Sequence, residues 1–454
     1  MRTTGTLPLD YQKPEEASSL LIRPAKNRQA ERFAPAVPQS VSDLGISPSL
    51  LEQLIFKFLY CRGDMLAGDL SRALGLKFSV IQAMLETFKL QHLVQVRSSL
   101  SVGSISSLLS LTEAGRKLAR EHLEYNHYVG PAPVPVNQYT DAVNAQQMPR
   151  NWLRPERLAK AYAHMVITED TLDQIGPAVN SGKSLLIYGQ PGNGKTHLAE
   201  ALSRIQTTEI YVPHALEHQG AIIRLFDPHC HRAIESCDQT SECETDGRWV
   251  RCRRPFVVSG GELSVAMLDL SYNAVSKIYD APLQLKANNG IYLIDDFGRQ
   301  VASPVEILNR WIVPMDRYVD HLSLSNGGKV TVPFGTFLVF STNLNPNDLG
   351  DEAFLRRIQY KMLVRSPDEY EFTAIFKNFC ELNELHPHPR LISNFVEKHY
   401  AQTGKPFRRC HPRDVITLAI DYIHYKRLPY ELTEELLDRA FENCFLSAAN
   451  LSDS

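Results

Sequence analysis

The stretch SLLIYGQPGNGKTHLAEAL contains the residues of this chain that are best suited to bind phosphate. Ser184–Tyr188 is a compact apolar run that predicts a strand, Gly189–Thr196 fits the pattern G-x-x-x-x-G-K-[ST], and His197–Ile205 has the spacing of a helix. The glycines let successive backbone N–H groups turn toward an anion, and the beginning of a helix adds its dipole. A Gly-rich turn that matches by chance is the alternative, but the preceding strand and following helix argue against it. The predicted contacts come from Gly189, Gln190, Pro191, Gly192, Asn193, Gly194, Lys195, Thr196 and His197.

Two side chains of this loop and two carboxylates further along the chain form a candidate reaction site. Lys195 can reach β- and γ-phosphates, and the Thr196 hydroxyl can hold Mg²⁺. The apolar run Ile291–Ile294 predicts a buried strand, and Asp295 and Asp296 follow it at its carboxyl end, where ligands bind in such sheets. We expect Asp295 to bind Mg²⁺, directly or through water, and Asp296 to polarise an attacking water.

The elements around these residues predict an α/β fold with a parallel sheet between layers of helices. Short apolar strands alternate with helical segments between about residues 180 and 366, and the chain is almost wholly helical in pattern from Pro367 onward. We therefore predict a nucleotide-binding domain at 151–366 and an all-α lid at 367–447.

The first third of the chain predicts a smaller, separate domain. Residues 1–45 are rich in Pro, Ser, Ala and charge, which predicts a disordered arm, and the Pro-rich segment 129–150 predicts a linker. Between them, 46–128 contain three helical stretches, two strand-like pieces and a further charged helix. This order resembles a winged helix, and LSLTEAGRKLA is similar to the exit from its wing.

Read in order, the motifs GQPGNGKT, LIDDFGR, LVFSTNL, DEAFLRRI and HPRDV resemble those of the AAA+ superfamily of ATPases. The resemblance covers about residues 150–447 and implies binding and hydrolysis of ATP with Mg²⁺. It implies that Asn343 contacts the γ-phosphate and the attacking water, and that Arg356 or Arg357 completes a neighbour's site. Arg413 in HPRD matches a phosphate-sensing arginine of the lid. Because a trans-acting arginine works only across an interface, the resemblance implies a ring, in this family a hexamer, or at least a stacked oligomer.

Several features leave alternatives open. Asn343 could be a strand-end cap, and the arginines could be surface charges. Asp296 stands where many AAA+ proteins have glutamate, so the shorter carboxylate could slow hydrolysis or make the site an ATP-controlled switch.

Two inserts bear on the function that ATP hydrolysis would serve. Arg248–Arg254 places four arginines beside Trp249, which could line a pore or touch nucleic acid, although a solvated hairpin with a buried Trp is the favoured interpretation. The segment Val319–Thr336 predicts a hairpin that turns at Asn326-Gly327-Gly328. A hairpin at this position resembles the one found in the AAA+ branch that contains protease unfoldases, Holliday-junction motors, MoxR proteins and enhancer-binding proteins.

A group of histidines and cysteines in the first insert is a candidate zinc site. It lacks the CxxC spacing of tight structural zinc sites, so free side chains are the favoured interpretation. The group comprises His229, Cys230, His231, Cys237, Cys243 and Cys252.

Composition narrows the function classes. The net charge of −3 gives no general attraction to nucleic acid or anionic membranes. No apolar run reaches the roughly 18 residues of a membrane-spanning helix, no secretory signal is evident, and the dispersed cysteines favour a reducing compartment, so we expect a cytoplasmic protein without membrane partners. Residues 46–128 carry only a slight positive charge, and the helix expected to act as the recognition helix has few basic residues. This low charge favours a protein contact over DNA, and the AAA+ resemblance implies a ring-forming remodeller of a protein partner that the sequence does not identify. The alternatives are a DNA-associated regulator that binds DNA through 46–128 and a non-hydrolysing ATP switch.

Overall fold

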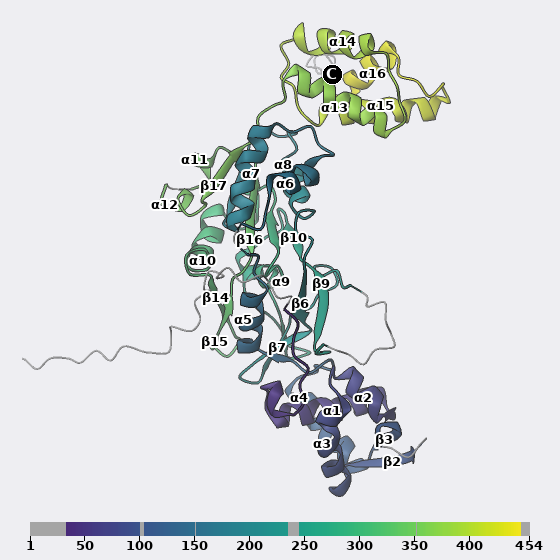
Figure 1. Cartoon of the computed structure of the whole chain (residues 1–454), viewed down its shortest axis with the longest axis vertical. Helices are drawn as coiled ribbons and strands as arrows, with labels where there is room; N and C mark the ends of the chain where they lie inside the picture. The colour runs from purple at the N-terminus through teal and green to yellow at the C-terminus, as the bar shows by residue number, and fades with distance from the viewer. Residues whose placement is uncertain (1–32, 100–103, 150, 235–244, 351, 446–454) are drawn as a thin grey trace, which may run out of the picture.

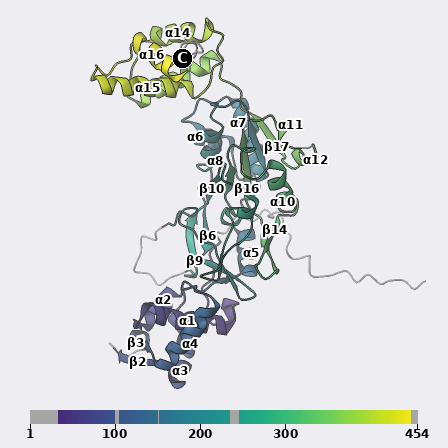
Figure 2. The ribbon, with the colours of Figure 1, turned by 180° about the vertical axis from the view of Figure 1, so that it is seen from behind.

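The computed structural model describes residues 33–99, 104–149, 151–234, 245–350 and 352–445. Figure 1 shows an elongated molecule in which four regions follow one another along the long axis. A helical region near the carboxyl end lies at one tip, a parallel sheet with its helices comes next, a second β region follows, and the amino-terminal helices lie at the other tip. The reverse view in Figure 2 shows the same succession.

The central sheet has five strands, all parallel, in the order β10-β13-β16-β5-β17. Each strand is short and most of its residues are apolar, as expected for strands that are covered on both faces. The strands are β5 (Leu185–Tyr188), β10 (Phe256–Ser259), β13 (Ile291–Ile294), β16 (Phe337–Thr342) and β17 (Tyr360–Leu363).

Helices cover both faces of this sheet because its side chains alternate in direction. Leu185 and Ile187 of β5 belong to one apolar core, shared with helices α6 (Pro155–Tyr162), α7 (Glu169–Ser181) and α8 (Lys195–Leu202). Leu186 lies in a second core on the opposite face, where α10 (Pro304–Arg317) contributes the buried Trp311. Three short helices connect the strands: α9 (Leu283–Lys286), α11 (Pro346–Leu349) and α12 (Glu352–Leu355).

A second β region, which the sequence does not predict as a unit, adjoins the parallel sheet. A five-stranded sheet in the order β11-β12-β8-β7-β4 shares one core with the antiparallel pairs β6-β9 and β14-β15 and with helix α5 (Val136–Ala145). The strands of this region are β4 (Val134–Pro135), β6 (Glu209–Pro213), β7 (Ala215–His218), β8 (Ala221–Arg224), β9 (Trp249–Arg253), β11 (Ser271–Asn273), β12 (Ile278–Asp280), β14 (Val319–Ser323) and β15 (Lys329–Pro333).

The segment expected to be a linker and the end of the expected arm are both folded. Within 129–150, β4 pairs with β7, and α5 buries Tyr139 and Val143 in the second β region. Apolar side chains at helical spacing after Pro135 outweigh the Pro-rich composition. Phe33 packs edge-on against Trp249, and Leu44 is fully buried, so residues 33–45 are also packed. Residues 1–32 lie outside the described part of the chain.

The amino-terminal region contains the elements expected from the sequence, in the expected order. Helices α1 (Pro48–Arg62), α2 (Ala67–Ala73), α3 (Phe78–Leu90) and α4 (Glu113–Tyr125) pack with an antiparallel sheet in the order β1-β3-β2. Its strands are β1 (Met65–Leu66), β2 (Val94–Ser99) and β3 (Ser107–Leu111). Ile222 and Ile278 of the second β region belong to the same core, which joins the two regions.

The carboxyl-terminal region is all-helical, as predicted. It contains α13 (Glu369–Leu382), α14 (Pro389–Val396) with a π-helical turn at Glu397–Ala401, α15 (His411–Lys426) and α16 (Glu434–Cys444). An aromatic cluster built around Phe372, Phe395 and Tyr400 forms its core.

Candidate functional site

The predicted phosphate loop lies between β5 and α8, with backbone torsions that favour glycine. Gly189, Gly192 and Gly194 have φ values of 148°, 79° and 81°. A Cβ atom on Gly189 would lie 2.4 Å from the Val364 carbonyl oxygen, so the close approach of β17 also requires glycine there. Helix α8 begins at Lys195 without a side-chain cap. Its first-turn N–H groups therefore remain available to an anion.

Lys195 is the buried cation of the loop. Its side chain is 6% exposed, and its Nζ donates to the carbonyl oxygens of Gly189 and Gln190 at 3.0 Å and to Asn343 Oδ1 at 2.5 Å. Burial lowers the pKa of Lys195, and the carboxylates of Asp296 and Asp295 oppose that shift. All three acceptors are neutral, so an anion at this position would supply the charge partner that the ammonium lacks.

Thr196 and Asp295 meet at the beginning of α8, as the sequence predicts. The Thr196 hydroxyl donates to both carboxylate oxygens of Asp295, at 3.2 and 3.0 Å. The Asp295 backbone carbonyl accepts from Gln300 Nε2 at 2.8 Å, which fixes the turn that follows β13. A hydroxyl beside a carboxylate is a ligand pair suited to Mg²⁺.

Asn343 connects the phosphate loop to the second carboxylate. Because β16 lies between β5 and β13, the residue that ends β16 emerges between Lys195 and Asp296. Asn343 Nδ2 donates to Asp296 Oδ1 at 3.0 Å while its Oδ1 accepts from Lys195. Asp296 has a left-handed φ of 48°, an uncommon conformation that turns its exposed carboxylate out of the strand direction. These five predicted residues therefore come together: Lys195, Thr196, Asp295, Asp296 and Asn343.

The segment leading into α15 contacts the loop through residues that sequence reasoning missed. The Cys410 N–H donates to the Gly192 carbonyl at 2.9 Å. Ser366 Oγ accepts from Asn193 Nδ2 at 3.3 Å and from Arg408 Nη1 at 2.5 Å. The Arg408 charge also lowers the pKa of Lys195, behind the larger effect of burial. Arg408 therefore lies near the phosphate loop. The sequence contains no motif that distinguishes Arg408 from its neighbour Arg409.

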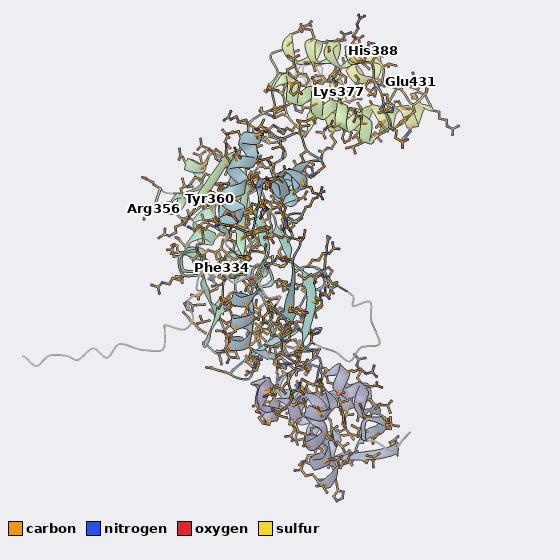
Figure 3. The ribbon with its side chains drawn as sticks, in the orientation of Figure 1. Phe334, Arg356, Tyr360, Lys377, His388 and Glu431 are labelled. Carbon is orange, nitrogen blue, oxygen red and sulfur yellow. The ribbon has the colours of Figure 1, made fainter. Side chains whose placement is uncertain are left out.

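Two of the three predicted arginines have other contacts, and the third is exposed. Arg413 is exposed and pairs with the adjacent Asp414 at 2.9 Å. Arg357 Nε lies 3.4 Å from Asp316 Oδ2 of α10. Arg356 is exposed at the outer side of the molecule, where Figure 3 shows it away from the body of the sheet. Of the predicted loop residues, His197 is also turned outward and contacts Glu200 at 3.1 Å.

The arginine-rich insert forms part of the β framework. The expected burial of Trp249 is confirmed, but the expected solvated hairpin is not, because β9 pairs with β6 rather than with a strand next to it in the chain, and Arg248 is buried. Trp249 is buried in β9, and Arg251 pairs with Glu209 on the adjacent β6 at 2.5 Å. Arg248 forms a fully buried ion pair with Asp246 at 2.8 Å. These arginines hold the insert together, and neither a nucleic-acid surface nor a pore lining is needed to account for them.

The predicted hairpin at Val319–Thr336 is present as β14 and β15. Five residue pairs connect the two strands, and Gly327 at the turn has a left-handed φ of 83°. Leu322 and Val330 are fully buried in the core of the second β region. The base of the hairpin is therefore anchored, whereas its turn at 325–327 is exposed.

The His/Cys cluster does not assemble into a metal site among the described residues. His231 is buried, and both ring nitrogens have backbone partners, the Asp227 N–H at 3.0 Å and the Lys286 carbonyl at 2.8 Å. Cys252 is fully buried in β9, where burial raises its thiol pKa to about 12. Cys237 and Cys243 lie outside the described residues.

Across the described ranges, no helix is both long and apolar enough to cross a bilayer.

Residues 368–443, which span α13 to α16, match the profile of a domain of unknown function (DUF8689). A search of curated proteins found no match. Among solved structures, a RuvB mutant from Thermotoga maritima is 14% identical, with a TM-score of 0.37 over 64% of this chain and 73% of that one. NtrX from Brucella abortus is 14% identical, with a TM-score of 0.38 over 64% of this chain and 58% of that one.

The class of fold rests on the molecule's own geometry. A five-stranded parallel sheet lies between helices, and a glycine-rich loop joins one of its strands to a helix that begins with Lys195 and Thr196. This arrangement matches the P-loop NTPase fold.

Proposed function

We propose that this chain is an AAA+ ATPase that binds ATP with Mg²⁺ at the loop Gly189–Thr196 and hydrolyses it. The observation that carries the proposal is the position of Asn343, whose side-chain amide contacts both Lys195 and Asp296. A strand-end cap would need neither contact. One side chain that reaches the phosphate-binding cation and the candidate water-activating carboxylate can sense the γ-phosphate and align a water.

The residues present fit a nucleotide and a metal ion. The uncapped beginning of α8 and the ammonium of Lys195 face the loop and together favour a polyanion there. Thr196 Oγ1 and Asp295 would hold Mg²⁺, which, when bound, neutralises charge on the phosphoryl oxygens. Asn193 Oδ1 is buried without a hydrogen-bond partner among the described residues, so the loop has not used all of its polar capacity.

Each side chain then has one task in hydrolysis. Lys195 binds the phosphate oxygens, Asn343 orients the water, and Asp296 accepts the proton of that water as it attacks. Asp296 is shorter than glutamate by one methylene group. Its left-handed backbone and its contact with Asn343 support a role close to the reacting water despite that shorter reach.

The proposed assembly is a ring, in this family a hexamer, in which Arg356 or Arg357 reaches a neighbour's site. Both lie between α12 and β17, at an edge of the sheet, and Arg356 is exposed. An arginine in such a position can stabilise phosphoryl charge on an adjacent subunit without disturbing its own fold.

The proposed work is remodelling of a protein partner, with the anchored hairpin β14-β15 and a winged-helix domain at 46–128 as contact elements. DNA binding by that domain is the second candidate. Two of its basic residues are already paired: Lys89 of α3 with Glu86 at 3.0 Å, and Arg97 of β2 with Asp64 at 2.8 Å. Paired cations contribute less to phosphate binding, which favours a protein contact.

Steady-state ATP hydrolysis across a protein concentration series tests the proposal, beside Lys195→Ala, Asp296→Asn and Arg357→Ala. Lys160→Ala, an exposed lysine of α6, is the matched control. We expect activity per chain that rises with concentration and is lost in the three site variants but kept in the control. ATP binding without turnover would contradict hydrolysis and support the switch. Salt-dependent retention of the full chain on duplex DNA would favour the second candidate for residues 46–128.

A further inference from the structure

A cavity of about 300 Å³ lies at the edge of the parallel sheet opposite the phosphate loop. Its lining includes Lys183, Gly290 and Thr336, which come just before β5, β13 and β16 respectively. The cavity is therefore at the amino-terminal ends of the strands, where the sheet meets the second β region. Its size is at the lower end of the range for small-molecule sites.

The charge of this cavity is one-sided. Its lining contains two cations, Lys183 and Arg254, and no aspartate or glutamate. Neither cation forms an ion pair within the described part of the chain. Cations lining a cavity without a carboxylate attract an anionic group.

Arg254 is a half-buried guanidinium with N–H donors that its protein contacts do not use. Its Nε, Nη1 and Nη2 each donate one hydrogen bond of 2.6 Å, to Thr208 Oγ1, the Asn289 carbonyl and the Gln146 carbonyl. These acceptors are neutral, and a guanidinium has five N–H groups, so two have no acceptor among the described residues. Burial lowers the pKa of Arg254 to about 10, which reflects a cation held without a counter-charge.

The cavity lining also contains a hydrogen-bond acceptor that no described residue uses. Asn289 is 6% exposed, and its Oδ1 has no hydrogen-bond partner among the described residues. Asn289 and Tyr318 both line the cavity with left-handed backbones, at φ of 61° and 58°. Tyr318 adopts this conformation as the C-cap of α10, and its backbone N–H donates to the Pro314 carbonyl, so the end of α10 fixes the position of its ring at the cavity.

The remaining wall is aromatic. Trp152, Tyr318 and Phe334 line the cavity, and Figure 3 shows Phe334 within the body of the molecule, below the level of Tyr360. Flat rings pack against a flat ligand at low entropic cost.

We propose that this cavity binds a small aromatic carboxylate, with its carboxylate at Arg254 and Lys183 and its ring against Trp152 and Phe334. The planar fork of arginine matches a carboxylate, and a donor on the ligand ring would satisfy Asn289 Oδ1. The site is independent of the proposed ATPase function, because it shares no residue with the phosphate loop.

Calorimetric titration of the full chain with 2-naphthoate tests this site, beside 2-naphthamide as a neutral analogue of the same shape. We expect one naphthoate per chain with a Kd below about 1 mM and amide binding weaker by roughly tenfold. Added ADP should leave naphthoate binding unchanged.

Two variants and a control locate the binding. Lys183→Gln should weaken naphthoate binding severalfold, and Arg254→Lys more strongly, because the fork is lost, whereas Lys160→Gln should have no effect. Circular dichroism checks that Arg254→Lys folds; if it does not, Lys183→Gln still decides. Equal affinity for acid and amide, failure to saturate, or undiminished binding by Lys183→Gln would each overturn the proposal.

Discussion

Asn343 and Asp296 are joined by a 3.0 Å hydrogen bond from the Asn343 side-chain amide to Asp296 Oδ1, although 47 residues separate them in sequence. The bond exists because β16 and β13 are adjacent and parallel, so both residues emerge at the same edge of the sheet. Lys195 approaches Asn343 from the other side. The candidate water-activating group is thus connected to the candidate phosphate-binding group through one amide.

Asn343→Ala and Asp296→Asn should each lower kcat for ATP hydrolysis by roughly 100-fold or more, because both act on the same water. Nucleotide affinity should change little, since Lys195 and the loop backbone remain. The double variant should be little worse than either single one, a non-additivity typical of groups that act as a unit. Assays of phosphate release measure kcat, and nucleotide titration measures the affinity. Multiplicative losses would mean that the two residues act separately.

Arg408→Ala should raise the Kd for ATP by roughly tenfold, because it removes a cation that lies near Lys195. Arg413→Ala is the matched control: Arg413 is exposed and paired with Asp414, so its loss should leave the Kd nearly unchanged. Titration with a fluorescent ATP analogue compares them. The reverse order of effects would show that Arg413 is the phosphate-sensing arginine, as the sequence motif predicts.

Lys57 predicts a pH dependence of stability in the amino-terminal region. It is fully buried in α1, donates to Asn126 Oδ1 at 2.7 Å and has no carboxylate partner among the described residues. Burial lowers the pKa of Lys57 to about 8, below its ordinary value of 10.5. Between these values the unfolded chain binds more protons than the folded one, so the free energy of unfolding rises with pH, by about 3 kcal/mol in total.

Thermal unfolding of the full chain from pH 7.5 to 10.5 measures this rise, and Lys57→Met should flatten it. Lys89→Met, which replaces a partly exposed lysine paired with Glu86, serves as the comparison and should keep the slope of the natural chain. A Lys57→Met variant with an unchanged slope would assign the titration to another group.

Asp246→Ala should lower the free energy of unfolding by about 3–5 kcal/mol, because it leaves Arg248 charged and unpaired in the interior. Arg248 also donates to the Leu44 carbonyl at 3.1 Å, so residues 33–45 should become more accessible to protease in this variant. Asp69→Ala removes an exposed pair with Arg72 and should cost less than about 1 kcal/mol. Denaturant unfolding and limited proteolysis report the two effects, and equal costs for the two variants would contradict the burial argument.

The sequence by itself determined the elements whose signals are local. The spacing from Gly189 to Thr196, between a strand pattern and a helix pattern, located the phosphate loop, and the apolar run before Asp295 located the second strand of the site. The turn at Asn326-Gly327-Gly328 likewise predicted the β14-β15 hairpin, because a left-handed turn has a strong local preference for these residues.

Only the tertiary structure decided which distant residues meet. The second β region combines strands from four separate segments, and no local pattern encodes such pairings. Composition suggested a linker at 129–150, yet the burial of Tyr139 and Val143 against strands far along the chain folds it into α5. Arg408 lies near the loop because Ser366, which precedes α13, contacts both Arg408 and Asn193. Arg254 is held in the sheet edge only because Gln146, Thr208 and Asn289 converge on it. Long-range burial and packing, which depend on the whole fold, settle these contacts.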